Sequence, residues 1–432
     1  MDHPNNFSAE ENFRQRNAVS HRAPRFLFCI FHANSSASAR VRGSFLVMMV
    51  LLFFGATDAR PQMQGLTPSG PITLVGKNGV LITGMRVTST TGNCISIENS
   101  SNIVIERSEI GPCGDPAADD MGNGIFISGS QKIEVSDNYI HVDNPTLVCC
   151  DKRDNVLVEG SSNVAIQGNV IAYGETNIEI NEMPSDHVSV IGNFLLNPRG
   201  PFPRGQNVQS WGSAEYGPNT KIAISENYAL SSFSEKGFSY AENQEDSISF
   251  GFTSDSSAIG NYVVGGHSPT GCGLIADQQA SGIQFLGNIL SDTGQCGVGI
   301  ASGVGHTVVG NKILNERPVP GAGNTALYVW NQYKGADCGQ IAIAKNVADE
   351  LKIDGATHSG YWDGGGCGNV VLNDNVWNVA AYEQLHPLSV TNPPPTIPVR
   401  PKSCVTVSPY TTNASLPSCG TMRKQPSNTA SP

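Results

Sequence analysis

Short apolar strands that end near an asparagine recur along most of the chain. The template apolar, any, apolar, any, any, Asn, any, apolar closely fits residues 133–140, 164–171, 188–195 and 283–290. Looser copies carry their asparagine at five further positions: Asn227, Asn261, Asn311, Asn346 and Asn375. Residues 103–110 and 80–87 fit with Ser108 and Met85 in the asparagine slot, which makes eleven passes through one pattern.

The spacing of these asparagines, from 23 residues (Asn288 to Asn311) to 35 (Asn311 to Asn346), is typical of solenoids or propellers. Within each copy, two apolar residues at period two, a bend and a further apolar residue indicate two short strands at a tight corner. A corner residue with positive φ is expected to be Gly or Asn. Asparagines stacked about 4.8 Å apart can hydrogen-bond amide to amide, so we expect structural rungs without a catalytic role.

A further short strand precedes most copies, for example "CISIENS", "GIFISGS", "NVLVEGS" and "NIEINEM", so each repeat has three strands. This layout resembles the right-handed parallel β-helix repeat proteins of the pectate-lyase-like superfamily, over roughly residues 72–377. The resemblance implies an all-β fold, a right-handed parallel β-helix of about ten to twelve three-strand coils with an asparagine ladder. It does not name a reaction, because one fold hosts many sites.

The composition suits a secreted β protein: 47 Gly, 15% charged and 39% hydrophobic residues. The apolar run "FLVMMVLLFFGA" at 45–56, preceded by Arg40 and Arg42, predicts a secretory signal cleaved near Ala59 and is too short to span a bilayer. We therefore expect a leader (1–59), the β-helix (60–380) and a disordered tail (381–432), since ten of the 26 Pro lie in 387–432. The mature chain is expected to be extracellular, without a membrane span.

The cysteine count supports export, because removal of the leader takes Cys29 from the eleven cysteines and leaves an even ten. Proximity in sequence suggests the following pairs: Cys94 with Cys113, Cys272 with Cys296, Cys338 with Cys367, and Cys404 with Cys419. Cys149 and Cys150 are left over. A metal site of cysteines is disfavoured because no CxxC occurs.

The formal net charge of −11 argues against nucleic acid as a partner, because its phosphates would be repelled. The expected partner is a polysaccharide or other glycan, bound by a monomer. An acidic polysaccharide would be repelled at long range unless Ca²⁺ bridges it or a local basic patch receives it, so Ca²⁺ is a candidate cofactor.

In the proteins that this chain resembles, substrates lie on the outward face of the strand that precedes the asparagine corner. Strand alternation predicts two outward columns here. The first column reads Ser96, Phe126, Leu157, Glu179, Gln209, Ser249, Ile275, Gly299, Tyr328 and Lys352. The second reads Glu98, Ser128, Glu159, Asn181, Trp211, Gly251, Asp277, Ala301, Trp330 and Asp354.

Two chemistries fit residues on these columns and on the loops that enter them. A hydrolase needs two carboxyl groups across the bond, for which Glu179, Glu245, Asp246 and Asp277 are candidates. A lyase needs a base and a cation to neutralise a uronate, for which Lys152, Arg153, Arg204, Tyr240 and His267 are available. The predicted catalytic residues are Glu179, Arg204, Glu245, Asp246 and Asp277. The predicted substrate-binding residues are Lys152, Arg153, Gln206, Gln209, Trp211, His267, Tyr328 and Trp330.

Each of these residues also has a structural interpretation. Acidic residues on a solenoid are usually solvated surface, and aromatic residues beneath loops are often packing. Arg204 could neutralise Glu245 or Asp246 rather than clamp a substrate.

Motifs of the characterised branches are missing. Asp119 and Asp120 are paired as in polygalacturonases, but neither GHG nor RxK follows; DPHE is absent, and "RGPFPR" at 199–204 departs from RxPxxR. Two hypotheses result: a secreted polysaccharide lyase or glycoside hydrolase, or a non-catalytic β-solenoid that binds glycans or a surface.

Overall fold

The computed structural model describes residues 65–115, 122–142, 153–202, 204–233 and 239–377. All of them belong to one of two compact units, Ala59–Pro432; the other, Met1–Asp58, lies wholly outside the described residues. The predicted leader, the predicted tail, Asp119, Asp120 and Lys152 also lie outside them. The coils described here run from Thr67 to Asn373.

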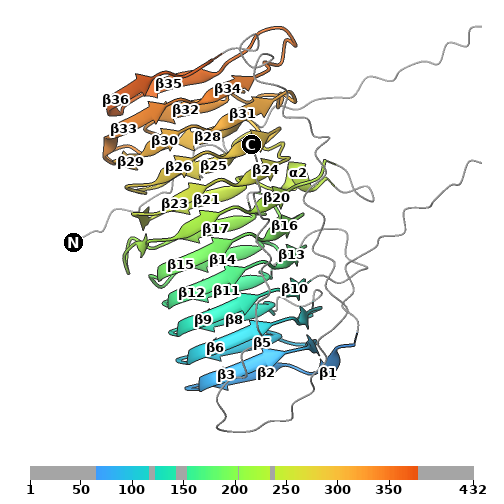
Figure 1. The fold of residues 1–432 in the computed structure, drawn as a ribbon. Helices are drawn as coiled ribbons and strands as arrows, with labels where there is room; N and C mark the ends of the chain where they lie inside the picture. The colour runs from blue at the N-terminus through green and yellow to red at the C-terminus, as the bar shows by residue number, and fades with distance from the viewer. Residues whose placement is uncertain (1–64, 116–121, 143–152, 203, 234–238, 378–432) are drawn as a thin grey trace, which may run out of the picture. The chain divides into compact units, whose positions relative to one another are not determined.

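Three parallel sheets, A, B and C, run the length of the stack, and the chain visits B, C and A in turn on every coil (Figure 1). Sheet A contains β1 (Thr67–Ser69), β4 (Met85–Val87), β7 (Glu109–Ile110), β10 (Tyr139–Ile140), β13 (Val170–Ala172), β16 (Phe194–Leu196), β20 (Tyr228–Leu230), β24 (Tyr262–Val264), β27 (Ile289–Ser291), β31 (Lys312–Asn315) and β34 (Val347–Glu350). Sheet B contains β2 (Ile72–Val75), β5 (Ile95–Glu98), β8 (Ile125–Ser128), β11 (Val156–Glu159), β14 (Ile178–Asn181), β17 (Val208–Trp211), β21 (Ile248–Gly251), β25 (Cys272–Ala276), β28 (Cys296–Ile300), β32 (Leu327–Trp330) and β35 (Tyr361–Gly365). Sheet C contains β3 (Asn78–Thr83), β6 (Ser101–Glu106), β9 (Gln131–Ser136), β12 (Ser162–Gln167), β15 (Asp186–Ile191), β18 (Asn219–Thr220), β19 (Ala223–Ser225), β22 (Thr253–Ser254), β23 (Ser257–Ile259), β26 (Gln284–Leu286), β29 (Gly303–Val304), β30 (Thr307–Val309), β33 (Cys338–Ala344) and β36 (Gly368–Asn373).

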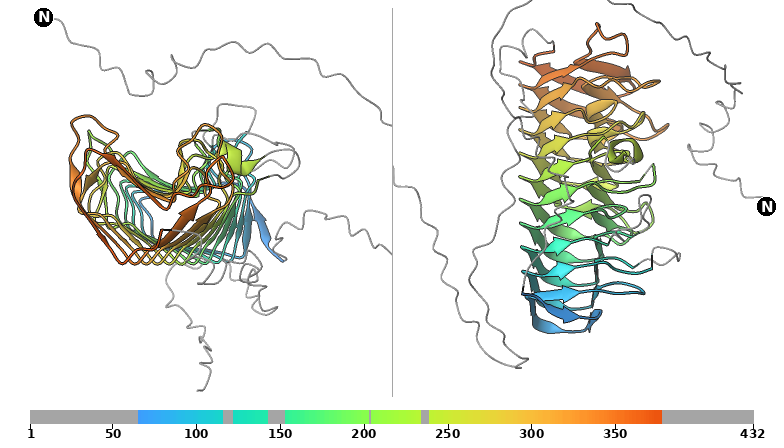
Figure 2. Two further views of the ribbon diagram at one scale, coloured as in Figure 1. Left: turned by 90° about the horizontal axis from the view of Figure 1, so that it is seen from above. Right: turned by 90° about the vertical axis from the view of Figure 1, so that its right-hand side faces the viewer.

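Sheets A and B each have 11 strands, so the structure confirms the predicted number of coils. Viewed down the axis, the traces of successive coils superpose (Figure 2). Among the described residues the one helix is the short α2 (Tyr240–Asn243), which lies in the segment between β20 and β21. No helix in the described part of the chain is long and apolar enough to cross a membrane.

The interior of the stack is a continuous apolar column. Alternate residues of sheet B point inward and are fully buried, as Ile178, Val208 and Ile248 illustrate on three successive coils. They belong to one hydrophobic cluster that also takes the inward residues of sheets A and C. Because each coil buries its apolar face only against its neighbours, stability depends on every strand keeping its register.

A ladder of buried asparagines fixes that register at the corner between sheets C and A. Each side-chain amide donates to the Oδ1 of the next rung at 2.9 to 3.1 Å. The rungs are Asn138, Asn169, Asn193, Asn227, Asn261, Asn288, Asn311, Asn346 and Asn375. Ser108 occupies the slot before them, where its N–H donates to Asn138 and its hydroxyl accepts from the N–H of Met85. The predicted structural role of the asparagines is confirmed.

The prediction for the backbone at this corner was wrong in one respect. The residue with positive φ is not the asparagine but the residue before it, for example Gly168 (64°) and Gly192 (63°). Asp137, Glu226 and Lys345 hold the same conformation at φ 55°, 56° and 57°. These charged residues are exposed, whereas the asparagines must turn inward to pair their amides, so the bend is made one residue earlier.

A second ladder, which the template did not reveal, lies where the chain enters sheet B. Asn155 donates to Asn177 at 2.9 Å, Asn177 to Asn207 at 3.0 Å, and Asn207 to the hydroxyl of Ser247 at 3.0 Å. These four residues are fully buried. They hold successive coils in register directly before the strands that carry the candidate site.

Three of the predicted disulfides are confirmed: Cys94–Cys113, Cys272–Cys296 and Cys338–Cys367. Each joins neighbouring coils. Cys149, Cys150, Cys404 and Cys419 lie outside the described residues.

Replacement of one rung should destabilise the whole stack. In Asn227→Ala, the backbone and side-chain N–H groups of Asn193 lose their acceptor and the carbonyl of Val190 loses a donor. Because an unsatisfied buried group costs about 1 to 3 kcal/mol, we expect a loss of about 2 to 4 kcal/mol, measured as a lower thermal and denaturant midpoint. Gln284→Ala, which removes an exposed amide from sheet C, is the matched control. Equal midpoints for the two variants would contradict the role of the ladder.

Candidate functional site

The strands of sheet B position two outward columns of side chains. The pairing places Glu179 beside Gln209, Gln209 beside Ser249, and Ser249 beside Ile275, as the alternation predicts. On the second column Asn181 lies beside Trp211, which lies beside Gly251. Strand pairing confirms the first predicted column from Ser96 to Tyr328. In the second column it confirms two runs: Glu98, Ser128 and Glu159, and then Asn181, Trp211 and Gly251.

The prediction for the last coil was wrong. Lys352 and Asp354 belong to a turn in which Lys352 N–H donates to the carbonyl of Thr357, and this turn follows β34 of sheet A. The strand that pairs with β32 is β35, which places Trp362 beside Tyr328. The sequence "LKIDGAT" imitates a strand, but Gly355 in the left-handed region turns the chain there.

Polar side chains at the entry to sheet B link each coil to the next. The backbone N–H of Asp154 donates to Asn123 at 2.9 Å, that of Thr176 to Asp154 at 3.1 Å, and that of Cys272 to Asp246 at 2.8 Å. Two carboxyl groups, Asp154 and Asp246, are thereby held at this edge with little exposure.

Asp154 and Glu179 form a carboxyl pair. Burial, and after it the charge of Glu179 and the hydrogen bond between the two groups, raises the pKa of Asp154 well above its ordinary value. Glu179 also accepts from Asn181 at 2.8 Å. Two carboxyls joined by a shared proton are closer than the separation of about 5 Å found across a scissile sugar bond. The pair therefore couples neighbouring coils rather than flanking a substrate.

A second group, which we call the acid–tyrosine cluster, contains Glu245, Asp246, Asp277, Tyr328 and Tyr333. Asp246 is 4% exposed, and Glu245 and Asp277 are half-buried. The hydroxyl of Tyr333 donates to Asp277 at 2.5 Å, although 56 residues separate them. The Thr270 hydroxyl donates to Glu245 at 3.0 Å, and Gln332 donates to the hydroxyl of Tyr328 at 2.9 Å.

Burial governs the protonation of this cluster. It raises the pKa of Asp246 well above the usual range, and the charges of Glu245 and Asp277 add to the effect. Burial also raises the pKa of Asp277, which the Tyr333 hydrogen bond partly offsets. The pKa values of both tyrosines are raised by burial and by the charge of Asp277, so both remain donors. The neutral form of Asp246 is therefore favoured by its surroundings.

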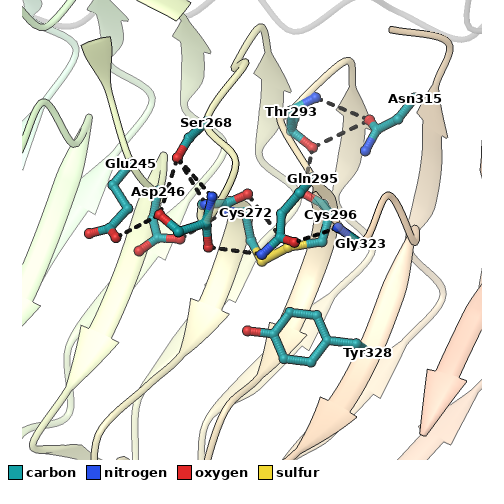
Figure 3. Close-up of a disulfide and its surroundings, with 12 residues drawn as sticks. Glu245, Asp246, Ser268, Cys272, Thr293, Gln295, Cys296, Asn315, Gly323 and Tyr328 are labelled. Carbon is teal, nitrogen blue, oxygen red and sulfur yellow. Dashed lines mark hydrogen bonds between the residues drawn. A yellow bond between two sulfur atoms is a disulfide. The ribbon is translucent and has the colours of Figure 1, made fainter. Parts of the chain in front are cut away.

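The disulfide Cys272–Cys296 lies beside the cluster (Figure 3). It joins β25 to β28, and the backbone N–H of Cys272 is the donor to Asp246. Figure 3 shows Glu245 and Asp246 on one side of the two sulfurs and Tyr328 below them. Gln295 extends this layer, because it donates to the carbonyl of Thr270 at 3.0 Å. The covalent link holds the donor of Asp246 in place across two coils.

Glycines in the outward columns make room for aromatic rings from neighbouring coils. A Cβ on Gly299 would lie 2.8 Å from the ring and hydroxyl of Tyr328, and a Cβ on Gly251 would lie 2.4 Å from the ring of Trp211. Tyr328 therefore leans back over β28 toward Asp277, while Trp211 leans forward over β21. The three carboxyl groups of the acid–tyrosine cluster belong to the coils of β21 and β25, which lie between the strands that carry these two rings.

The remaining predicted site residues fall into two groups. Gln209 lies beside the cluster, is 4% exposed, and its Oε1 has no hydrogen-bond partner among the described residues. Gln206 is buried and accepts from the hydroxyl of Thr176 at 3.4 Å. Trp211 contacts Phe252 edge to face at 6.3 Å, and Trp330 is 41% exposed.

The basic candidates do not join the acid–tyrosine cluster. Arg204 is exposed and forms no ion pair with a residue that the structure describes, so the predicted pairing with Glu245 or Asp246 is absent there. Arg153 is buried and donates to the carbonyl of Cys113. His267 packs edge-on against Phe233 and lies 3.9 Å from a carboxyl oxygen of Glu242 in α2.

Three residues of the site were missed from the sequence. Asp154 precedes its strand at a bend, where alternation no longer tells the direction of a side chain. Tyr333 follows β32 in a loop, and no periodicity connects it to Asp277. Trp362 was missed because the sequence pattern assigned the wrong segment to the last coil. Its ring centroid lies 5.8 Å from that of Trp330, a contact that depends on the pairing of β32 with β35.

A metal centre is not evident within the described ranges, where no three or more His, Cys, Asp or Glu side chains are grouped to hold an ion. The predicted Ca²⁺ therefore has no set of such side chains there.

Comparison with known proteins identifies the fold. Residues 70–200 match the family described as "Right handed beta helix region". No curated protein sequence matches the chain. Similar solved structures include DFA-IIIase from Arthrobacter chlorophenolicus A6 in complex with GF2 (12% identity over 67% of this chain and 70% of that chain, TM-score 0.46). Another is the Dettilon tailspike protein, with 12% identity over 71% of this chain and 61% of that chain and a TM-score of 0.49. A third is PfbA, a surface adhesin of Streptococcus pneumoniae, with 12% identity over 73% of this chain and 70% of that chain and a TM-score of 0.42.

These likenesses concern the fold alone, and the chain spans less than two thirds of the tailspike. Together, the family match over residues 70–200 and the three parallel sheets show that the chain folds as a right-handed parallel β-helix, and no characterised branch of that fold matches it.

The protonation of Asp246 should appear as a pH dependence of stability. Its pKa in the folded chain is raised above the ordinary 3.8, so its contribution is complete below about pH 4 and is lost as pH rises through the folded value. Asp246→Asn, which cannot ionise and keeps an acceptor for Cys272, should lose less stability than the wild type between pH 4 and pH 8. The measurement is the thermal midpoint across this range. Glu316→Gln, at an exposed carboxyl, should follow the wild type; parallel curves for Asp246→Asn would show that Asp246 ionises normally.

Proposed function

We propose that this chain is an exported glycoside hydrolase that acts on a polysaccharide laid across the outward face of sheet B. The observation that carries the proposal is the acid–tyrosine cluster. Burial raises the pKa of Asp246 well above its ordinary value and so favours its protonated form, and Asp277, on the next coil, accepts a hydrogen bond from the hydroxyl of Tyr333. Two carboxyl groups in different environments are what acid and base roles require. The disulfides support export, because they persist in oxidising compartments.

In this proposal Asp246 is the general acid. It passes its proton to the glycosidic oxygen as the bond from that oxygen to the anomeric carbon breaks. Asp277 accepts a proton from the water whose oxygen forms the new bond to that carbon. The products are two sugar chains, one with a new reducing end, and a second proton exchange with water restores both carboxyls.

The strand offset favours an inverting reaction. Asp246 precedes β21, whereas Asp277 follows β25, so the two lie on adjacent coils but at opposite ends of the strands. Asp277 stands level with Gly251, so the backbones of the two residues are offset by about 16 Å along the strands. The two side chains must therefore point toward one another to reach the separation of about 6.5 to 9.5 Å of an inverting pair, and the effect of the Asp277 charge on the pKa of Asp246 supports that approach. Gln209, whose buried Oε1 lacks a donor among the described residues, is suited to accept a hydrogen bond from a sugar hydroxyl.

Hydrolysis is favoured over a lyase reaction by the charge of the cluster. A lyase must neutralise a uronate carboxylate with a cation. The charges that shift the pKa values of Asp246 and Tyr328 are all carboxylates. Arg204 is exposed and forms no ion pair with them among the described residues. An additional carboxylate from the substrate would be repelled.

The second candidate function is a non-catalytic glycan-binding β-solenoid. The depth of Asp246 favours it, because that side chain is 4% exposed and one of its oxygens already accepts the Cys272 N–H. In that case the cluster would serve to hold the coils together.

The test is hydrolysis of a panel of neutral and uronate-containing polysaccharides by the full chain, followed by reducing ends and by ultraviolet absorbance. We expect reducing ends without absorbance, and a loss of about 10²- to 10⁴-fold in kcat for Asp246→Asn and Asp277→Asn. Glu316→Gln should retain full activity. NMR of the first product should show an inverted anomer.

Other outcomes separate the alternatives. Absorbance from a new double bond would identify a lyase instead. Binding without new reducing ends on any polysaccharide would favour the non-catalytic solenoid. Activity that persists in both carboxyl variants would place the reaction elsewhere on the chain.

A further inference from the structure

We propose that Trp330 and Trp362 form a stacking subsite for a neutral pyranose ring, and that the polysaccharide runs along the coils from this subsite to the acid–tyrosine cluster. The inference rests on the proposed function and deepens it, since it names the class of substrate and its direction. We call the two indoles the tryptophan platform.

The platform is built from two adjacent coils. Trp330 ends β32 and Trp362 lies in β35, and their ring centroids are 5.8 Å apart at 62°. A Cβ on Gly364 would lie 2.5 Å from Cγ of Trp330, so the Trp330 side chain packs directly against the backbone of the next coil. Any larger residue at this position would displace the Trp330 side chain.

The two rings are exposed where packing would bury them. Trp330 is 41% exposed and Trp362 is 46% exposed, whereas Trp377 of the same end is half-buried and stacks on Tyr361 at 5.5 Å. A large aromatic surface in water on an outward strand needs a partner with an apolar face. The CH-rich face of a pyranose ring is such a partner, and its hydroxyls can remain solvated at the rim.

The platform is continuous with the candidate catalytic groups. The ring centroids of Tyr328 and Trp362 are 6.4 Å apart, and Tyr328 belongs to the apolar cluster against which Tyr333 packs. The hydroxyl of Tyr333 in turn donates to Asp277 at 2.5 Å. An unbroken line of side chains therefore runs from the acids through Tyr328 to the platform. Asp277 follows β25, two coils before β32, which corresponds to about 10 Å along the axis. That distance suits about two sugar units between the broken bond and the stacked ring.

Charge selects a neutral chain. Any sugar that reaches the platform from the cluster passes Glu245 and Asp277, and Asp363 beside Trp362 is also exposed. Lys334 is the exposed cation nearest in sequence to the platform strands among the described residues, and it follows Tyr333 in the loop rather than on the face of sheet B. A uronate at these positions would meet carboxylates without a compensating cation on the sheet.

The experiment uses the full chain with the substitution Asp246→Asn, so that oligosaccharides are bound without turnover. Neutral gluco-, xylo- and manno-oligosaccharides of two to eight units, with oligogalacturonates as the acidic comparison, are titrated by calorimetry. Trp330→Ala and Trp362→Ala, each added to this background, should weaken the binding of long neutral oligosaccharides by about fivefold to tenfold and leave short ones unchanged. Val371→Ala, which truncates an exposed apolar residue of the same end on sheet C, should have no effect.

Three results would overturn the platform. They are an equal loss of affinity in the tryptophan variants at every oligosaccharide length, tighter binding of oligogalacturonates than of neutral oligosaccharides, and no detectable binding of any oligosaccharide. Protection of Trp330 and Trp362 from acrylamide quenching in the full chain would also overturn it, because residues 378–432 or a second copy would then occupy the surface. The two proposals fail separately. If binding depends on length but the wild type hydrolyses nothing, the hydrolase proposal is wrong and the platform proposal stands. If Asp246→Asn abolishes hydrolysis but the tryptophan variants show no dependence on length, the platform proposal is wrong and the hydrolase proposal stands.

Discussion

The whole structure depends on the buried amide ladder at the corner between sheets C and A. Each rung accepts both a backbone and a side-chain N–H from the rung before it, as Asn227 does from Asn193. These bonds form only when successive coils stand at the same depth and register. A slip of one residue would leave buried amides unpaired and turn each apolar strand face outward. The ladder thus converts a sequence repeat of uneven length into strands of uniform spacing.

Uniform register is also what creates a site from distant residues. Asp246 and Asp277 come from successive coils, and Tyr333 reaches back to Asp277 from a loop beyond β32. The loops and the neighbouring rings exclude water from this part of sheet B, and in that environment an ionised carboxyl next to two others is unfavourable. Burial, rather than any cation, therefore sets the protonation of Asp246.

Glycines on sheet B leave room for aromatic side chains from neighbouring coils. On an isolated strand a glycine would weaken the sheet, but here it admits a ring from the neighbouring coil: Tyr328 over Gly299, Trp211 over Gly251 and Trp330 over Gly364. Each of these side chains then packs against the backbone of the neighbouring coil. Tyr328 packs against the preceding coil and so faces the acid–tyrosine cluster, whereas Trp330 packs against the following coil.

The sequence by itself determined the repeat, the three strands of each coil, the asparagine rungs, three disulfides and the first outward column as far as Tyr328. Periodicity suffices for these because a strand alternates strictly and neighbouring coils repeat the same pattern. Only the tertiary structure decided the rest: the pairing of Asp154 with Glu179, the reach of Tyr333, and the place of Trp362 in the last coil. Those features arise at bends, loops and turns, where alternation ends and the path of the backbone depends on contacts between residues far apart in the chain.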